Sequence, residues 1–151
     1  MTSQIAEPDI IMTPVGGGGL LSGISIVAKN QWKNTLVYGV EPKNADDAYQ
    51  SFISKKFVAS NNPITMADGL KTSLSDRTLK IILNNVDDII TIKEHSIIDA
   101  MRLVFQYLKI VIEPSSAVPL AAVIENANLF KDKKVAIILS GGNVDLANLP
   151  F

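Results

Sequence analysis

Four consecutive glycines, Gly16 to Gly19, separate a short apolar run from a stretch with helical periodicity. The run before them, Asp9 to Val15, is nearly continuous in apolar residues, which predicts a strand buried on both faces. Apolar residues after the glycines recur at helical spacing, at Leu20, Leu21, Ile24, Val27 and Ala28. Glycines free the backbone to bend, and the N–H groups that open a helix attract anions. The sequence therefore predicts a strand, an anion-binding loop and a helix.

Known glycine motifs leave the nature of this anion open. A Walker phosphate loop ends in Gly-Lys-Ser/Thr, whereas this loop continues as Gly19-Leu20-Leu21-Ser22. A dinucleotide fingerprint requires an acidic residue at the end of the next strand, and Glu41 occupies that place. The glycines thus indicate either a phosphate-bearing cofactor or a dinucleotide, and the remaining alternative is a tight turn without a ligand.

Further apolar runs predict the rest of the fold. Strands are expected at residues 36–40 and 89–92 and at residues 135–139, the clearest buried strand in the chain. Thr91 and Glu94 have the spacing of a capping box, which predicts a helix with an apolar stripe from Ile97 to Leu108. Another helix should begin after Pro114. This alternation is typical of an α/β fold, a three-layer, mostly parallel twisted sheet with helices on both faces, and we expect one domain over residues 1–151.

Composition narrows the class of partner. Fourteen basic residues nearly balance fifteen acidic ones without any block of like charge, which argues against nucleic acid or a membrane surface as partner. The apolar runs are far shorter than the roughly 18–20 residues that span a bilayer. The chain has no cysteine, which fits a reducing compartment, and we expect it in the cytoplasm. A small molecule or another subunit is the expected partner.

A second glycine turn, residues 140–143, follows the predicted strand 135–139 and reads Ser140-Gly141-Gly142-Asn143. Open α/β sheets place ligands at the carboxyl ends of their strands, so this turn should share a cleft with Gly16 to Gly19. The alternative is a simple strand-to-helix turn in which Ser140 caps the helix that follows.

Taken together, the motifs match one family in order and spacing. They are Pro14 to Leu20, Glu41 to Ala48, Ala67 to Gly69, Val86 to Ile89, Glu113 to Ser115 and Leu139 to Leu146. The chain resembles the C-terminal half of the pyridoxal-phosphate-dependent serine/threonine dehydratase and serine racemase family, of fold type II. The resemblance covers nearly the whole chain and favours pyridoxal phosphate over a dinucleotide.

The resemblance implies a set of cofactor-binding residues. Gly16, Gly17, Gly18 and Gly19 would hold the cofactor phosphate through their amides, and Ser140 would reach the pyridine nitrogen. A serine cannot keep a proton on that nitrogen as a carboxylate would, which suits β-elimination or racemisation. Gly69 would lie against the cofactor ring, although a plain turn is the alternative. Glu113 would lie beside the cofactor cleft or would cap the following helix.

The resemblance also implies a cation site. The segment from Glu41 to Asp47 is similar to one that binds a divalent cation in serine racemases, here through Glu41, the carbonyl of Ala45 and Asp47. Three oxygen ligands suit Mg²⁺ or Ca²⁺. The alternative is an acidic helix start that complements the helix dipole.

The chain departs from the family in one respect. Neither the Ser-x-Lys-x-Arg-Gly segment of the Schiff-base lysine nor the Ser-x-Gly-Asn-His segment for the substrate carboxylate occurs in it. No catalytic residue is therefore assigned. Two functions stay open: part of an ammonia-lyase or racemase acting on L-serine or L-threonine, or an inactive phosphate-binding or assembly module. A homo-oligomer, or pairing with an upstream half, is expected in either case.

Overall fold

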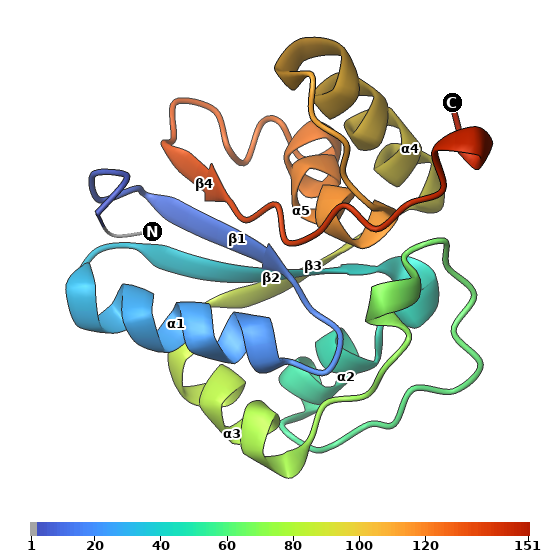
Figure 1. Ribbon diagram of the computed structural model, residues 1–151. Coiled ribbons are helices and arrows are strands. Elements are labelled where there is room, and N and C mark those ends of the chain that lie inside the picture. The colour runs from blue at the N-terminus through green and yellow to red at the C-terminus, as the bar shows by residue number, and fades with distance from the viewer. Residues whose placement is uncertain (1–2) are drawn as a thin grey trace.

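The computed structural model describes residues 3–151 as a parallel four-stranded sheet with helices packed on it (Figure 1). The strands are β1 (Ile10–Pro14), β2 (Leu36–Pro42), β3 (Asp88–Ile92) and β4 (Val135–Ile137), in the spatial order β3-β2-β1-β4. The α-helices are α1 (Gly19–Gln31), α2 (Asp47–Ser54), α3 (Asp76–Asn85), α4 (Glu94–Leu103) and α5 (Pro114–Glu125). A π-helical turn, Val104–Leu108, extends α4. Within the described residues, no helix is both long and apolar enough to cross a membrane.

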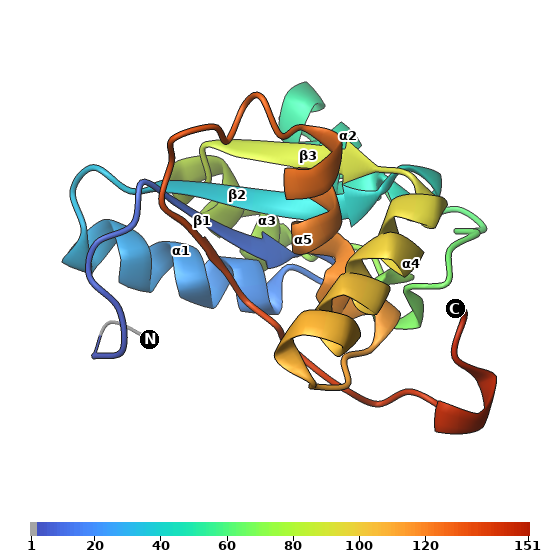
Figure 2. The same cartoon turned by 90° about the horizontal axis from the view of Figure 1, so that it is seen from above.

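Helices cover both faces of the sheet (Figures 1 and 2). Met12 and Val40 pack with α4 and α5 on one face, whereas Ile11, Val37 and the helices α1, α2 and α3 form the core on the other. Adjacent residues of one strand point to opposite faces, so a strand covered on both sides is apolar throughout. This architecture confirms the α/β fold that the sequence predicts.

The strand β4 is shorter and less buried than the sequence predicts. It ends at Ile137 rather than at residue 139, and all three of its residues are only half-buried. The reason is its position, since β4 forms an edge of the sheet and pairs with β1 alone. The prediction of a clearly buried strand over residues 135–139 is therefore wrong, whereas the prediction of a strand buried on both faces is correct for β1.

The predicted capping box does not form. Thr91 belongs to β3, and the residue that precedes the first turn of α4 is Lys93, whose side chain makes no cap. The Glu94 carboxylate accepts a hydrogen bond from the amide of Met66 instead, at 3.0 Å. A carboxylate from another helix, Glu125 of α5, accepts from the Lys93 amide at 2.9 Å and so caps α4.

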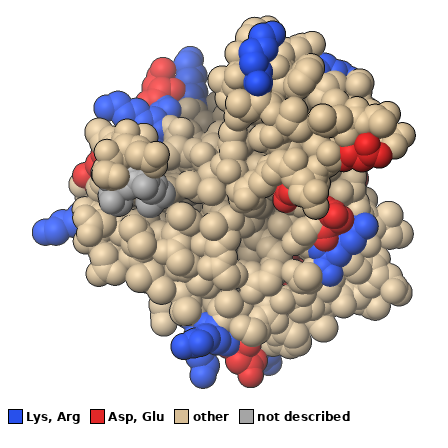
Figure 3. Space-filling view, in the orientation of Figure 1, with Lys and Arg blue, Asp and Glu red and all other residues tan. Residues whose placement is uncertain are grey.

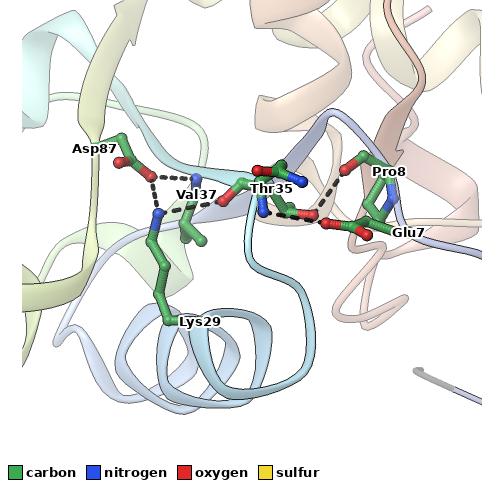
Figure 4. Close-up of polar contacts among 7 residues, drawn as sticks. Glu7, Pro8, Lys29, Thr35, Val37 and Asp87 are labelled. Atoms are coloured by element: carbon green, nitrogen blue, oxygen red, sulfur yellow. Dashed lines mark hydrogen bonds and ion pairs between the residues drawn. The ribbon is translucent and has the colours of Figure 1, made fainter.

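A polar network connects the segments at the amino ends of the strands (Figure 4). The Lys29 ammonium at the end of α1 lies 2.6 Å from the Asp87 carboxylate and donates to the carbonyl of Thr35 at 3.1 Å. The same Asp87 oxygen accepts from the Val37 amide at 2.7 Å, and the Thr35 hydroxyl donates to the carbonyl of Pro8 at 2.7 Å. Asp87 thus joins α1 to β2 and has a structural role.

Replacing Asp87 by Ala should lower the free energy of unfolding by about 1–2 kcal/mol, because two hydrogen bonds to a charged but half-exposed group are lost. Urea unfolding followed by circular dichroism measures the change. Asp99→Ala is the matched control, since its ion pair with Arg102 is exposed and long at 3.3 Å. That control should change stability by less than about 0.5 kcal/mol. Equal losses in both variants would contradict the role given to Asp87.

Candidate cofactor site

The glycine loop leads directly from β1 into α1. The strand β1 ends at Pro14, and α1 begins at Gly19. Gly18 precedes the first turn with φ +80°, a left-handed conformation that favours glycine. No side chain caps this end of α1, and its first turn contains no acidic residue. The opening N–H groups of the helix are thus left without an intrahelical or side-chain partner, which is the arrangement that binds an anion.

The glycines of the loop differ in how much space a side chain would find at each position. A Cβ atom at Gly16 would lie 2.9 Å from the carbonyl oxygen of Gly69, and one at Gly18 would lie 2.7 Å from Leu74. A Cβ at Gly19 would have nothing within 4 Å. Packing therefore explains glycine at positions 16 and 18. It does not require glycine at position 19, where a side chain would project into open space beside the helix start.

A cavity of about 190 Å³ adjoins this loop at the carboxyl edge of the sheet. All seven residues predicted to bind the cofactor line it, namely Gly16, Gly17, Gly18, Gly19, Gly69, Glu113 and Ser140. Pro14, Leu20, Leu70 and Ser115 complete the lining. Three loops and the start of α5, distant in sequence, thus meet around one space. On the face shown in Figure 3, most charged side chains lie near the periphery, and a small mixed group of acidic and basic side chains lies to the right of the centre.

Ser115 positions the wall that contains Gly69. Its hydroxyl is buried and accepts a hydrogen bond from the Gly69 amide at 3.1 Å. A Cβ atom at Gly69 would lie 3.0 Å from that same oxygen. A side chain at this position would have to displace the Ser115 hydroxyl, so contacts within the chain itself already favour glycine. Sequence reasoning did not identify Ser115 as a site residue, because a serine in the first turn of a helix ordinarily indicates a cap.

Glu113 holds the second glycine turn in place. Its carboxylate accepts a hydrogen bond from the Asn143 amide at 3.1 Å, and its own amide donates to the carbonyl of Gly141 at 3.1 Å. The Ser116 hydroxyl accepts from the Gly141 amide at 3.4 Å. Glu113 makes no side-chain cap on α5, so that alternative is wrong. The alternative for Ser140 is wrong as well, because no helix begins directly after it.

The lining carries a single ionisable side chain, that of Glu113. Each of the twelve lysines of the chain lies in the described residues, and none lines the cavity. The cavity can hold and orient an anion through backbone amides and hydroxyls. None of these lysines brings its amine to the cavity for a covalent bond, which agrees with the absence of the lysine segment from the sequence.

Glu41 lies at the carboxyl end of β2 and is fully buried. Its carboxylate accepts hydrogen bonds from the amides of Ala48 at 3.1 Å and Tyr49 at 2.9 Å, at the start of α2. Burial raises the pKa of Glu41 to about 8, although these two amides oppose the rise. Each carboxylate oxygen of Glu41 thus accepts a hydrogen bond from the start of α2. This arrangement corresponds to the alternative in which the acidic residue stabilises a helix start and does not bind a cation.

Ala45 and Asp47 line a second cavity, of about 140 Å³, together with Ser60. Both carboxylate oxygens of Asp47 are buried without a hydrogen-bond partner, and so is the Ser60 hydroxyl oxygen. Burial raises the pKa of Asp47 to about 6, and its own backbone amide and the nearby Ser60 hydroxyl lower it in part, although neither makes a hydrogen bond of normal geometry to the carboxylate. Glu41 does not line this cavity. Within residues 3–151, no three acidic, histidine or cysteine side chains gather as a metal site.

Sequence comparisons match the chain to known enzymes. Residues 1–141 match the family model described as pyridoxal-phosphate dependent enzyme. The β-hydroxyaspartate dehydratase of Paracoccus denitrificans is 42% identical over 151 residues, which are 100% of this chain and 48% of that protein. The serine racemase of Dictyostelium discoideum is 46% identical over 155 residues, with 99% of this chain and 47% of that protein covered. The chain thus spans about half the length of the curated relatives it matches.

Solved structures agree with the sequence comparisons. The Dictyostelium discoideum serine racemase structure is 48% identical and superposes with a TM-score of 0.88 over 95% of this chain and 47% of that one. The threonine deaminase of T.th. is 43% identical with a TM-score of 0.89, over 93% of this chain and 52% of that one. Both share the parallel sheet with its covering helices. The chain therefore belongs to the family of pyridoxal-phosphate-dependent enzymes of fold type II.

Proposed function

We propose that this chain is the cofactor-binding part of a serine/threonine dehydratase or serine racemase. Its main support is the cavity at which the uncapped start of α1 and four glycines meet Gly69, Glu113 and Ser140. Relatives named as serine racemase, threonine deaminase and β-hydroxyaspartate dehydratase add support. Small hydroxy amino acids, L-serine and L-threonine, are the proposed substrates.

Each of the seven predicted residues in the lining has a proposed role toward the cofactor. The amides of Gly16 to Gly19 bind the phosphate at the positive end of α1. The Ser140 hydroxyl meets the pyridine nitrogen, and Gly69 leaves room for the ring. Glu113 keeps the loop of Ser140 in position through the Asn143 amide. Bound pyridoxal phosphate supplies an electron sink for the α-carbon of an amino acid, and these residues hold and orient it.

We also propose a Mg²⁺ or Ca²⁺ site in the cavity of Asp47. The two unpartnered buried oxygens of Asp47 support it, since a buried carboxylate without hydrogen bonds is costly unless a cation compensates it. The Ala45 carbonyl and the Ser60 hydroxyl are further oxygen ligands at the same cavity. Glu41 joins this site only if its carboxylate releases the amides of α2.

Replacing Asp47 by Asn should weaken the binding of Mn²⁺, used as a probe ion, by at least about tenfold, because the charge that attracts a hard cation is removed. The loss of the free-ion signal in electron paramagnetic resonance measures binding. Asp99→Asn is the matched control on an exposed helix position and should bind Mn²⁺ as the unmodified chain does. If both variants bind equally well, Asp47 is not a ligand.

The absence of a lysine from the cavity lining supports a second candidate, an inactive phosphate-binding or assembly module. The two candidate functions differ in whether the whole protein is an active enzyme. Both lead to the same expectation for this chain by itself. Alone, it should bind pyridoxal phosphate without covalent attachment, since a covalent bond needs an amine within reach of the aldehyde.

Borohydride reduction followed by mass spectrometry tests this expectation. The purified chain is mixed with pyridoxal phosphate and reduced, and ammonia release from L-serine and L-threonine is assayed in parallel. We expect no single lysine to carry the reduced cofactor and no ammonia above background. One specifically modified lysine, together with turnover that disappears when that lysine alone is replaced by Ala, would show that the chain has its own catalytic base.

A further inference from the structure

The first turn of α5 holds two loops of the cofactor cavity that are far apart in sequence. Glu113, directly before the helix, accepts a hydrogen bond from the Asn143 amide at 3.1 Å and so contacts the turn at residues 140–143. Ser115, the second residue of the helix, accepts one from the Gly69 amide at 3.1 Å. The start of α5 therefore fixes that turn and the segment of Gly69 relative to each other.

The Ser115 hydroxyl is a buried hydrogen-bond donor beside the cavity. Ser115 belongs to the cavity lining, and only 3% of the residue is exposed. A hydroxyl has one proton to donate and two lone pairs that accept, and the Gly69 amide uses one of the lone pairs. Among residues 3–151, no oxygen or nitrogen atom accepts the proton of this hydroxyl. Buried donors are nearly always satisfied, so the unused proton indicates an acceptor atom of a ligand in the cavity.

Gly69 lies between the glycine loop and Ser115. A Cβ atom at Gly16 would lie 2.9 Å from the Gly69 carbonyl oxygen, whereas the Gly69 amide donates to the Ser115 hydroxyl. The same amide also donates to the carboxylate of its neighbour Asp68 at 2.9 Å, so it is held from two sides. A ligand that binds the glycine loop at one end and extends along Gly69 would thus reach Ser115 with its other end.

Packing against Ser115 also accounts for glycine at position 69. A Cβ atom there would lie 3.0 Å from the Ser115 hydroxyl oxygen and 3.9 Å from a carboxylate oxygen of Glu113. The φ angle of Gly69 is not in the left-handed region, so the backbone conformation alone does not call for glycine. A side chain at this position would crowd the hydroxyl. Glycine leaves the hydroxyl accessible from the cavity.

We propose that Ser115 is a binding residue for the ring system of the cofactor, which accepts its hydroxyl proton while the amides of Gly16 to Gly19 hold the phosphate. Inorganic phosphate has no ring and gains nothing from this contact. Ser115 therefore selects pyridoxal phosphate over other phosphates. The inference rests on the proposed function for the phosphate at the glycine loop, and it adds a ligand contact that this function does not contain.

Paired titrations of the ¹⁵N-labelled chain with pyridoxal phosphate and with inorganic phosphate test this proposal. The amide signals of Gly17 to Gly19, followed by nuclear magnetic resonance, report both affinities at the same loop. Ser115→Ala should lower the affinity for pyridoxal phosphate by at least about fivefold, because a hydrogen bond to the ligand is lost. Its affinity for inorganic phosphate should stay within about twofold of that of the unmodified chain.

Two substitutions at the same position make the test specific to the hydroxyl. Ser115→Thr retains the hydroxyl and should bind both compounds within about twofold of the unmodified chain. Ser115→Cys replaces the hydroxyl by a thiol, which is a weak donor, and should lose affinity for pyridoxal phosphate by at least about threefold. The Cys variant keeps the proposal testable if Ser115→Ala does not fold, and circular dichroism establishes the fold of each variant.

Ser51→Ala is the matched control. Ser51 lies in α2, is fully buried and accepts a hydrogen bond from the Val58 amide at 2.9 Å. It does not line the cofactor cavity. The substitution thus removes the same kind of contact between a helix serine and a loop amide, and it should leave both affinities within about twofold of the unmodified chain.

The outcomes separate this proposal from the proposed function. A loss for pyridoxal phosphate below about fivefold in Ser115→Ala would overturn the proposal, and so would an equal loss for inorganic phosphate or a loss of the same size in Ser51→Ala. In each of these cases the proposed function stands, because the unmodified chain binds pyridoxal phosphate at the glycine loop. If pyridoxal phosphate shifts none of the signals of Gly17 to Gly19 in the unmodified chain, the proposed function fails and this inference fails with it.

Discussion

Replacing Gly19 by Asp should lower the affinity for pyridoxal phosphate by at least about tenfold, which corresponds to about 1.4 kcal/mol of binding free energy. Gly19 is the first residue of α1 and lines the cavity, and its Cβ position is open. An aspartate there would place a negative charge where the phosphate is proposed to bind. The fold should not suffer, because acidic residues in the first turn of a helix stabilise it by about 0.3–1 kcal/mol. Fluorescence titration with pyridoxal phosphate measures the affinity.

The control for this prediction is the same substitution one turn further along the helix. Gly23 is exposed, has nothing within 4 Å of its Cβ position and does not line the cavity. Gly23→Asp should therefore bind pyridoxal phosphate with an affinity within about twofold of the unmodified chain, since screening weakens the field of an exposed charge with distance. If Gly19→Asp binds as tightly as this control, the phosphate lies elsewhere.

Replacing Gly18 by Val should lower the free energy of unfolding by about 2–5 kcal/mol, the sum of a left-handed backbone penalty and overpacking. Gly18 has φ +80°, and a Cβ atom there would lie 2.7 Å from Leu74 and 2.9 Å from Thr78. Urea unfolding measures the loss, with Gly19→Val as the matched variant at an open position. A loss below about 1 kcal/mol for Gly18→Val would contradict the packing described for this loop.

Much of the fold could be predicted because the spacing of apolar residues along the sequence depends on which faces of a strand or helix are buried. Residues 9–15 are apolar throughout, and β1 is covered on both faces, so the pattern and the structure agree. The same pattern at residues 135–139 was misleading, since an apolar run does not reveal whether a neighbouring strand is present. Thr91 and Glu94 have the spacing of a capping box, but a local pattern cannot reveal that Glu125, distant in sequence, caps the helix.

The candidate site was predictable to the extent that its residues lie in distinctive turns. The loop from Gly16 to Gly19 and the turn at Ser140 stand directly after strands, and parallel strands bring such turns to one edge. Ser115 was missed, because its contact with Gly69 joins segments that are 46 residues apart. The contacts of Glu41 with α2 could not be predicted from the residue type either, because a carboxylate can equally well bind a cation or accept hydrogen bonds from the start of a helix.

The central claim is that the amides of Gly16 to Gly19 bind the cofactor through its phosphate. Nuclear magnetic resonance of the ¹⁵N-labelled chain tests it most directly, by titration with pyridoxal phosphate and, separately, with pyridoxal. We predict that pyridoxal phosphate shifts the amide signals of Gly17, Gly18 and Gly19 and that pyridoxal, which lacks the phosphate, leaves them in place. Equal shifts with both compounds, or shifts confined to residues away from the glycine loop, would contradict the claim.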